Sequence, residues 1–216
     1  MTSDHDLIIP VGDAKLEGDL AIPDDARAII AFAHGSGSSR HSPRNRAVAD
    51  DLNGAGLATL LFDLLTEEED RIDQQTGELR FDIELLAERL AGATRWLREN
   101  DETRALAIGY FGASTGAAAA LVAAAEIPDA VGAVVSRGGR PDLAGDALQA
   151  VAAPTLLIVG GEDTAVIQMN REALDRLRCE KSLEIVEGAT HLFEEPGTLE
   201  VVARLARDWF AERLTG

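Results

Sequence analysis

From about residue 28 onward, short apolar runs alternate with longer stretches in which apolar residues recur at helical spacing. Strands covered on both faces are nearly continuous apolar runs, whereas a helix packed on a sheet carries one apolar stripe. The runs expected to form buried strands are 28–33, 57–65, 105–111, 130–136, 154–160 and 183–186. The stretches expected to form helices are 45–54, 82–99, 117–125, 166–177 and 199–214. This alternation predicts an α/β fold with a mostly parallel central sheet and helices on both faces.

The start of the chain instead predicts two strands that pair directly with each other. Residues 7–11 and 16–22 are separated by Gly12-Asp13, a dipeptide that favours a tight turn. We therefore expect an antiparallel hairpin at one edge of the sheet. Because no linker, repeat or low-complexity segment follows, residues 1–216 are expected to form a single domain.

Two polar segments interrupt the alternation of strands and helices. Residues 66–80 are rich in glutamate and aspartate and predict a loop of about 15 residues, a length that is often functional. Residues 137–153, between two predicted strands, amount to only about 17 residues and leave no room for a helical cap. The expected architecture is therefore a three-layer sandwich without a cap domain.

Composition narrows the possible classes of function. The chain has 216 residues, of which 46% are hydrophobic, and this suits a folded domain with a large core. A formal net charge of −18 disfavours contact with nucleic acid or an anionic membrane. The acidic N-terminus lacks the features of a signal peptide, and no apolar run approaches the roughly 20 residues of a membrane helix. We expect a cytoplasmic protein whose single cysteine, Cys179, is a spectator thiol without neighbouring metal ligands.

Residues 112–116, Gly-Ala-Ser-Thr-Gly, match the pattern G-x-S-x-G. An apolar run of strand length precedes them and an alanine-rich helix follows, and a nucleophile elbow requires this succession. The strained turn would raise Ser114 Oγ above the sheet. Gly112 and Gly116 would leave room where a Cβ would strike a neighbouring strand or helix. Ser114 is therefore the candidate nucleophile, although a turn serine that caps the helix fits the same pattern.

A serine hydroxyl needs a base to accept its proton and a third group to orient that base. His191 follows the predicted strand 183–186, and Asp163 follows the strand 154–160. Both are therefore expected at the edge where the parallel strands end, which is where ligands bind in open α/β sheets. Glu162 competes with Asp163 for the role of acid, and we favour Asp163 because it lies further into the loop.

The other histidines are expected to play lesser parts. His5 lies in the N-terminal tail, and His34 lies in the turn after the first buried strand, where a structural hydrogen-bonding role is expected. His41 lies in a polar loop from which it could reach the site.

A tetrahedral oxyanion needs preorganised hydrogen-bond donors. The backbone N–H of Thr115, the residue after the nucleophile, is expected to supply one of them. The loop after the first buried strand is expected to supply the other, and within Gly35-Ser36-Gly37 we choose the N–H of Ser36. These glycines could instead serve only to make a tight turn.

At these residues the chain resembles a serine member of the dienelactone-hydrolase-like α/β hydrolases, over about residues 28–214. The segments that carry the resemblance are 34–39, 112–116, 160–163 and 188–191. It implies Ser114 as nucleophile, Asp163 as acid, His191 as base, a lidless minimal fold, and hydrolysis of esters or lactones without a cofactor or metal. Dienelactone hydrolase itself uses a cysteine nucleophile, so carboxylesterase is the expected activity. Sequences of this pattern often stand beside or fused to a phosphoribosyltransferase domain, and no such domain is expected here.

Four arginines follow the oxyanion loop or a predicted strand end: Arg40, Arg44, Arg137 and Arg140. An arginine fork binds carboxylate or phosphate well. Arg40, His41 or Arg137 could therefore contact an acidic group of a substrate. The favoured alternative is that these arginines pair with the carboxylates of residues 67–70.

The expected function is that of a serine hydrolase that cleaves esters or lactones of small molecules through an acyl-enzyme intermediate. The same triad could instead transfer the acyl group to an alcohol or act as a perhydrolase, and the scaffold could serve as a non-enzymatic binding module. The expected partner is a small-molecule ester, and the protein is expected to be a monomer or a homodimer.

Overall fold

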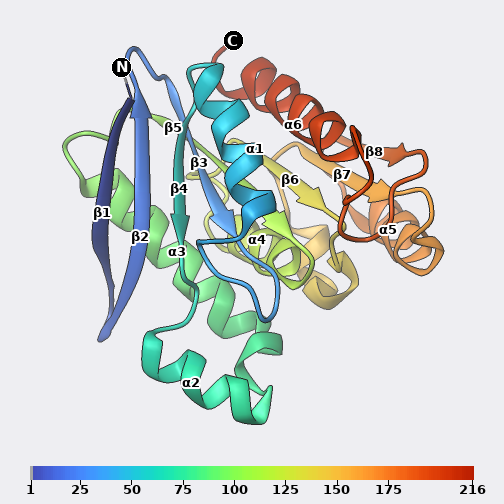
Figure 1. The fold of residues 1–216 in the computed structure, drawn as a ribbon, viewed down its shortest axis with the longest axis horizontal. Coiled ribbons are helices and arrows are strands. Elements are labelled where there is room, and N and C mark those ends of the chain that lie inside the picture. The colour runs from blue at the N-terminus through green and yellow to red at the C-terminus, as the bar shows by residue number, and fades with distance from the viewer. Residues whose placement is uncertain (1) are drawn as a thin grey trace.

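Residues 2–216, the part of the chain that the structure describes, form one eight-stranded sheet in this computed structural model, with side chains described from Asp6 onward (Figure 1). The order of the strands is β1-β2-β4-β3-β5-β6-β7-β8. β1 and β2 pair antiparallel, as do β2 and β4, and the remaining neighbours are parallel. The strands are β1 (Thr2–Val11), β2 (Ala14–Pro23), β3 (Ala28–Ala33), β4 (Ala58–Phe62), β5 (Ala107–Ala113), β6 (Ala133–Arg137), β7 (Thr155–Gly160) and β8 (Lys181–Val186).

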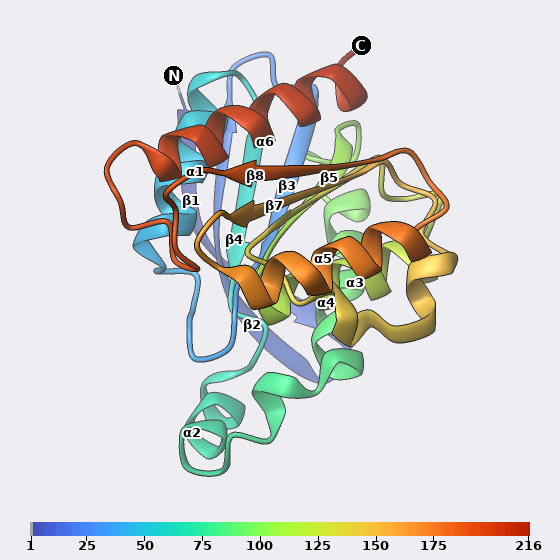
Figure 2. The same cartoon turned by 90° about the vertical axis from the view of Figure 1, so that its right-hand side faces the viewer.

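Helices cover both faces of this sheet, as the sequence predicted. α1 packs against α6 on one face, and α3 packs against α4 on the other; Figure 2 shows the sheet between α6 and α5. The α-helices are α1 (Pro43–Gly54), α2 (Glu67–Thr76), α3 (Ile83–Glu99), α4 (Thr115–Glu126), α5 (Thr164–Arg176) and α6 (Thr198–Leu214). Two 3₁₀ segments complete the fold, η1 (Leu79–Phe81) and η2 (Pro141–Gln149). Within residues 2–216, no helix has both the length and the apolar character needed to cross a bilayer.

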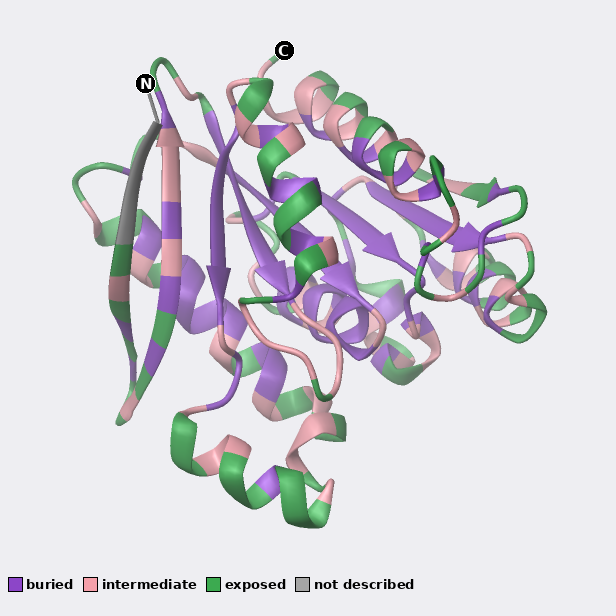
Figure 3. Cartoon of the chain, viewed as in Figure 1, coloured by how far each residue is buried: buried purple, intermediate pink, exposed green. Residues whose placement is uncertain are grey.

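Alternating side chains of the central strands supply two separate apolar cores. In β3, Ile29 and Ala31 belong to the core beneath α3 and α4, whereas Ile30 and Phe32 belong to the core beneath α1 and α6. Every residue of β3 is buried, which explains why this strand is a continuous apolar run in the sequence (Figure 3). The segment between β6 and β7 contains only η2, which packs against α4 and α5.

The N-terminal hairpin is longer than predicted. β1 begins at Thr2, and its register places His5 opposite Leu20 of β2. The prediction that His5 lies in a tail is therefore wrong, because its backbone belongs to β1. The first residues of β1 are polar and were therefore not predicted to form a strand. An edge strand tolerates such residues because it does not need apolar side chains on both faces.

The polar segment 66–80 is mostly helical, and its prediction as a loop is wrong. Thr66 caps α2: its hydroxyl accepts a hydrogen bond from the Glu69 N–H at 3.2 Å, and the Glu69 carboxylate accepts one from the Thr66 N–H at 2.8 Å. This reciprocal pair is a capping box, and Thr-x-x-Glu is its signature in the sequence. Acidic residues in the first turn also suit the positive end of the helix dipole. α2 projects from the body of the molecule (Figure 1).

Gly92 permits the close packing of α3 on β1. A Cβ at this position would lie 2.2 Å from Cγ1 and 2.8 Å from Cγ2 of Val11. We expect Gly92→Ala to lower the free energy of unfolding by about 1–3 kcal/mol, because overpacking outweighs the better helix propensity of alanine. Urea unfolding measures the change. The matched control is Gly54→Ala at the end of α1, where a Cβ meets nothing within 4 Å. An equal loss in both variants would contradict the packing argument.

Candidate active site

Ser114 joins β5 to α4 in a strained backbone conformation, with φ 52° and ψ −121°. A positive φ is costly for a residue with a side chain and persists only where the surroundings enforce it. Here the Ser114 N–H donates to the Arg137 carbonyl at 3.2 Å, and the Ser114 carbonyl accepts from the N–H groups of Ala117 at 3.1 Å and Arg140 at 3.0 Å. The strained turn predicted from the G-x-S-x-G pattern is confirmed.

The two glycines of the motif are required by close backbone packing. A Cβ on Gly116 would lie 2.2 Å from the Ala33 carbonyl oxygen and 2.4 Å from that of His34, and a Cβ on Gly112 would lie 2.4 Å from Ala117 Cα. These are backbone atoms, which cannot move aside as a flexible side chain can. The first turn of α4 therefore packs closely against the end of β3. The sequence predicted a close approach at these glycines, and the structure shows which strand makes it.

His191 and Asp163 form a hydrogen-bonded pair. Nδ1 of His191 lies 2.6 Å from Oδ2 of Asp163, whose side chain is only 15% exposed. Asp163 follows β7 and begins α5, while His191 lies in the loop of residues 187–197 after β8, hereafter the His191 loop. Glu162 is exposed, and its N–H donates to the Ala189 carbonyl. Of the two candidate acids, Asp163 is thus the one that contacts the imidazole.

Ser114 and His191 lie against the same short turn, residues 137–140 after β6, hereafter the β6 turn. Its Arg137 carbonyl and Arg140 N–H both bond to Ser114. A Cβ on Gly138 would lie 3.6 Å from Nδ1 and Cε1 of His191 and 3.1 Å from the carbonyl oxygen of that residue. Within the described part of the chain, neither Ser114 Oγ nor His191 Nε2 makes a hydrogen bond. Both atoms are therefore free to form hydrogen bonds with a substrate.

The loop between β3 and α1 lies directly beside the nucleophile. A Cβ on Gly35 would be 3.0 Å from Ser114 Cβ, and the Ser36 N–H donates to Thr115 Oγ1 at 2.9 Å. The structure thus brings together Ser36 and Thr115, the two residues predicted to hold an oxyanion. It also shows that the Thr115 hydroxyl already occupies the Ser36 N–H, a contact that the sequence did not predict.

His34 has the structural role that its position predicted. Nδ1 lies 3.0 Å from the Gly35 carbonyl oxygen, and Nε2 accepts a hydrogen bond from the Leu64 N–H at 3.1 Å. The carbonyl requires a proton on Nδ1, and the Leu64 N–H requires a lone pair on Nε2, so the ring is neutral. Burial lowers the pKa of His34 below its ordinary value, against the opposing effect of the Gly35 hydrogen bond.

The proposed pairing of arginines with residues 67–70 is wrong. Arg40 is held by other carboxylates: those of Asp63, Glu17 at 2.6 Å and Asp19 at 3.5 Å. These three anions raise the pKa of Arg40 and leave its fork little capacity for a substrate, although burial opposes them. Their acidic side chains come from β2 and from the end of β4, which the sequence pattern could not place beside the β3–α1 loop.

The other three arginines near this edge also have different neighbours. Arg44 pairs with Glu194, Arg140 pairs with Asp142, and the buried Arg137 donates to Asn45. His41 is exposed, and its Nδ1 lies 3.1 Å from a guanidinium nitrogen of Arg46. Arg40 is therefore enclosed by carboxylates and Arg137 is buried, whereas His41 is exposed beside Arg46.

A cavity of about 1320 Å³ opens between the β3–α1 loop and α2. Its lining includes Ser36, His41 and Arg80 but neither Ser114 nor His191. Arg80 is fixed by Asp73, with a 2.7 Å ion pair and a second bond from its backbone N–H. The sequence did not predict this cavity, because α2, which forms one of its walls, was predicted to be a loop.

Comparisons with known proteins show the family and the fold of this chain. The model of the dienelactone hydrolase family matches residues 16–212. A crystal structure of a dienelactone hydrolase from Anabaena variabilis is 61% identical, with 99% of each chain covered and a TM-score of 0.97. Est1E from Butyrivibrio proteoclasticus, solved with bound ferulic acid, shares the fold at 17% identity, with 97% of this chain and 100% of that chain covered and a TM-score of 0.80.

Two curated relatives come from Mycobacterium tuberculosis strains and carry the name "Putative phosphoribosyl transferase". Each is 58% identical over 213 residues, which cover 99% of this chain and 47% of the relative. The chain therefore spans about half the length of these relatives.

The neutral His34 makes stability depend on pH. The lowered pKa means that the unfolded chain binds a proton at this residue more readily than the folded chain. The free energy of unfolding should therefore fall as the pH drops below about 6.5, where an unfolded histidine becomes protonated. We expect His34→Gln to lose less stability than the wild type between pH 7 and pH 5.5, as measured by urea unfolding. His41→Gln, at an exposed site, should follow the wild type, and identical slopes in all three would contradict the prediction.

Proposed function

Because this chain belongs to the dienelactone hydrolase family, we propose that it is a serine hydrolase that cleaves carboxylic esters or lactones of small molecules. The observation that carries the proposal is the 2.6 Å pair between His191 and Asp163 at the same β6 turn that supports the strained Ser114. The proposal is also supported by the positions of the three residues, which follow three different strands, β5, β7 and β8, in the chain order Ser, Asp, His.

The proposed reaction has two steps. Ser114 Oγ attacks the carbonyl carbon, and His191 Nε2 accepts the hydroxyl proton and then gives it to the departing alkoxide. Asp163 holds Nδ1–H and stabilises the imidazolium while it is charged. In the second step His191 removes a proton from water, the hydroxide attacks the acyl-enzyme, and the carboxylic acid leaves as Ser114 regains its proton.

The N–H groups of Thr115 and Ser36 are proposed to hold the oxyanion. In the free protein the Ser36 N–H is bonded to the Thr115 hydroxyl. A developing alkoxide carries more negative charge than a hydroxyl oxygen and is the stronger acceptor. We therefore propose that the oxyanion replaces Thr115 Oγ1 as the partner of the Ser36 N–H during the reaction, so the loop is already held close to its working position.

The region shared with the longer relatives is proposed to carry hydrolase chemistry rather than the transferase chemistry in their name. The support is the family match over residues 16–212, which covers most of that shared region.

Ser114→Ala tests the nucleophile. This variant should lose labelling by a fluorophosphonate probe, and its kcat for 4-nitrophenyl acetate should fall by about a thousandfold or more, because the proposed acyl-enzyme cannot form without Ser114 Oγ. Intact-mass spectrometry measures the labelling. Ser36→Ala is the matched control: only its backbone N–H is assigned a role, so it should keep most labelling and activity. Labelling that persists in Ser114→Ala would overturn the proposal.

Asp163→Asn tests the acid against its neighbour. An amide cannot stabilise the imidazolium, and kcat for an ester should fall by about a thousandfold or more. Glu162→Gln, one residue away and exposed, should change kcat less than about threefold, as other exposed substitutions do. Steady-state kinetics on the same ester compares the two. Equal effects would remove Asp163 from the triad.

A further inference from the structure

Arg137 is a buried cation without an acidic partner. Its residue is 7% exposed, and its Nη2 donates one 3.3 Å hydrogen bond to the neutral amide of Asn45. Its Nε is buried and has no partner among the described residues. The chain contains 38 aspartates and glutamates, yet none of those that the structure describes forms an ion pair with this guanidinium.

This arrangement is unfavourable unless something neutralises the charge. Burying an ion without a counter-ion costs several kcal/mol, and natural cores usually supply a partner. Burial, with a smaller effect from the nearby Arg44, lowers the pKa of Arg137 to about 10. The group therefore remains protonated at neutral pH, and its positive charge persists.

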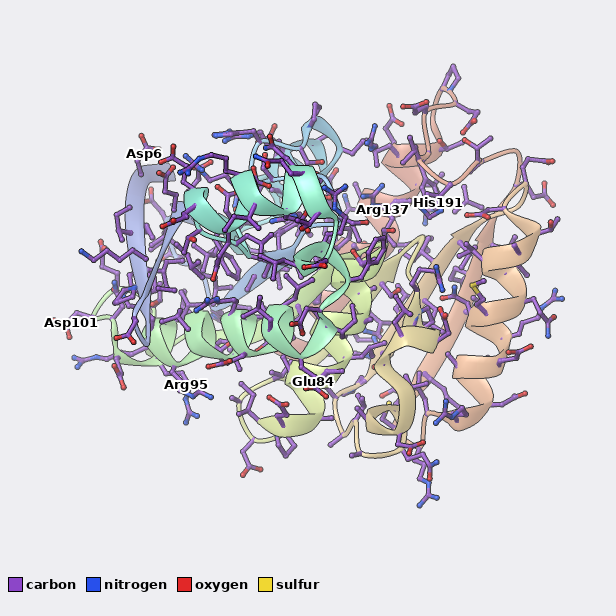
Figure 4. All side chains as sticks on the ribbon, turned by 90° about the horizontal axis from the view of Figure 1, so that it is seen from below. Asp6, Glu84, Arg95, Asp101, Arg137 and His191 are labelled. Carbon is purple, nitrogen blue, oxygen red and sulfur yellow. The ribbon has the colours of Figure 1, made fainter. Side chains whose placement is uncertain are left out.

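The surroundings of Arg137 add positive charge. Arg44 and Asn45 lie in the first turn of α1, where the helix dipole is positive. The ring of Phe193 lies 6.0 Å from the Arg137 guanidinium carbon and supplies an apolar wall. Figure 4 shows Arg137 and His191 close together at this edge of the molecule.

Arg44 provides the approach from solvent. Its side chain is 33% exposed, its Nε is buried without a partner, and its Nη1 contacts the exposed Glu194 carboxylate at 3.2 Å. Glu194 belongs to the His191 loop and is 63% exposed, so a stronger anion can displace it at small cost.

We propose that Arg137, Arg44 and the first turn of α1 bind a small oxyanion, namely a carboxylate or a phosphate group. Two guanidinium groups can each donate paired hydrogen bonds to the oxygens of such a group. The anion supplies the counter-charge that Arg137 lacks. The backbone of Arg137 is also bonded to that of the nucleophile, because the Arg137 carbonyl accepts the Ser114 N–H. The bound group is either the acidic end of a substrate or a free ion.

Inorganic phosphate is the probe for the first experiment. Calorimetric titration of the full chain with phosphate should show saturable binding. Chloride in the buffer is lowered as phosphate is added, so that the ionic strength stays constant. Arg137→Met should bind phosphate at least about tenfold more weakly, since a charged pair of hydrogen bonds is lost. The variant should fold, because an apolar side chain of similar length replaces an unpaired charge. Circular dichroism checks the fold.

Surface variants keep the test decisive if Arg137→Met does not fold. Arg44→Met should also weaken phosphate binding, whereas Glu194→Gln should strengthen it by removing the competing carboxylate. Arg176→Met, at a partly exposed arginine paired with Asp146, is the matched control and should bind as the wild type does. No saturable binding by the wild type, or unchanged binding in both Arg44→Met and Glu194→Gln, would overturn the site.

Ester kinetics distinguish the two sources of the anion, and this arm rests on the proposed function. If the acidic end of a substrate fills the site, phosphate should raise KM for mono-4-nitrophenyl succinate and leave KM for 4-nitrophenyl acetate unchanged. If a free ion fills it, phosphate should affect both esters alike. Either pattern supports the site. A protein that binds phosphate but hydrolyses neither ester would contradict the proposed function and leave the oxyanion site standing.

Discussion

The contact between the first turn of α4 and the end of β3 is the constraint on which the site depends. At Gly116 the two backbones are so close that no side chain fits between them. This packing forces the chain to reverse sharply after β5, and Ser114 takes the positive φ that a gentler turn would avoid. The same approach brings the β3–α1 loop over the nucleophile, where Ser36 bonds to Thr115. The energy stored in the turn is offset by the buried helix and strand on either side.

The β6 turn is the second support, and it serves several groups at once. It bonds to both backbone groups of Ser114, it begins at the buried Arg137, and a Cβ added to its Gly138 would lie 3.6 Å from the His191 ring. A change in this turn would therefore move the nucleophile, the base and a buried charge together. Within the His191 loop, Glu195 accepts two hydrogen bonds from Thr190 at 3.0 and 2.7 Å. Hydrogen bonds to this carboxylate hold the pKa of Glu195 below its usual value.

Charge is distributed unevenly around these supports. The chain is strongly acidic as a whole, and Arg40 is enclosed by carboxylates of β2 and β4. Arg137 lies at the end of β6, and its neighbours are an amide, an aromatic ring and another arginine. Two arginines that look alike in the sequence thus differ in their chemistry: one is neutralised, and the other remains available to an anion.

Most of the fold followed from the sequence because local causes determine it. The buried strands are continuous apolar runs in the sequence. The two glycines of the G-x-S-x-G motif predicted the elbow, because the packing there leaves no room for a Cβ. The order of Ser114, Asp163 and His191 along the chain, each after a strand, was enough to predict that they share one edge. The sequence analysis did not predict α2, because the polar composition of this segment suggested a loop. Its Thr-x-x-Glu pattern is nevertheless the signature of a capping box.

The sequence by itself determined the layers of the fold and the elbow, because each depends on residues that are near neighbours in the chain or on the common direction of parallel strands. It favoured Asp163 over Glu162 as the acid, and the contact with His191 in the structure distinguishes the two. Only the tertiary structure decided the partners of the arginines, the hydrogen bond that occupies the Ser36 N–H and the cavity beside α2. These depend on which side chains from distant segments meet, and an ion pair or a buried charge leaves no periodic signal in the sequence. Charge interactions act through space between groups whose separation along the chain is arbitrary.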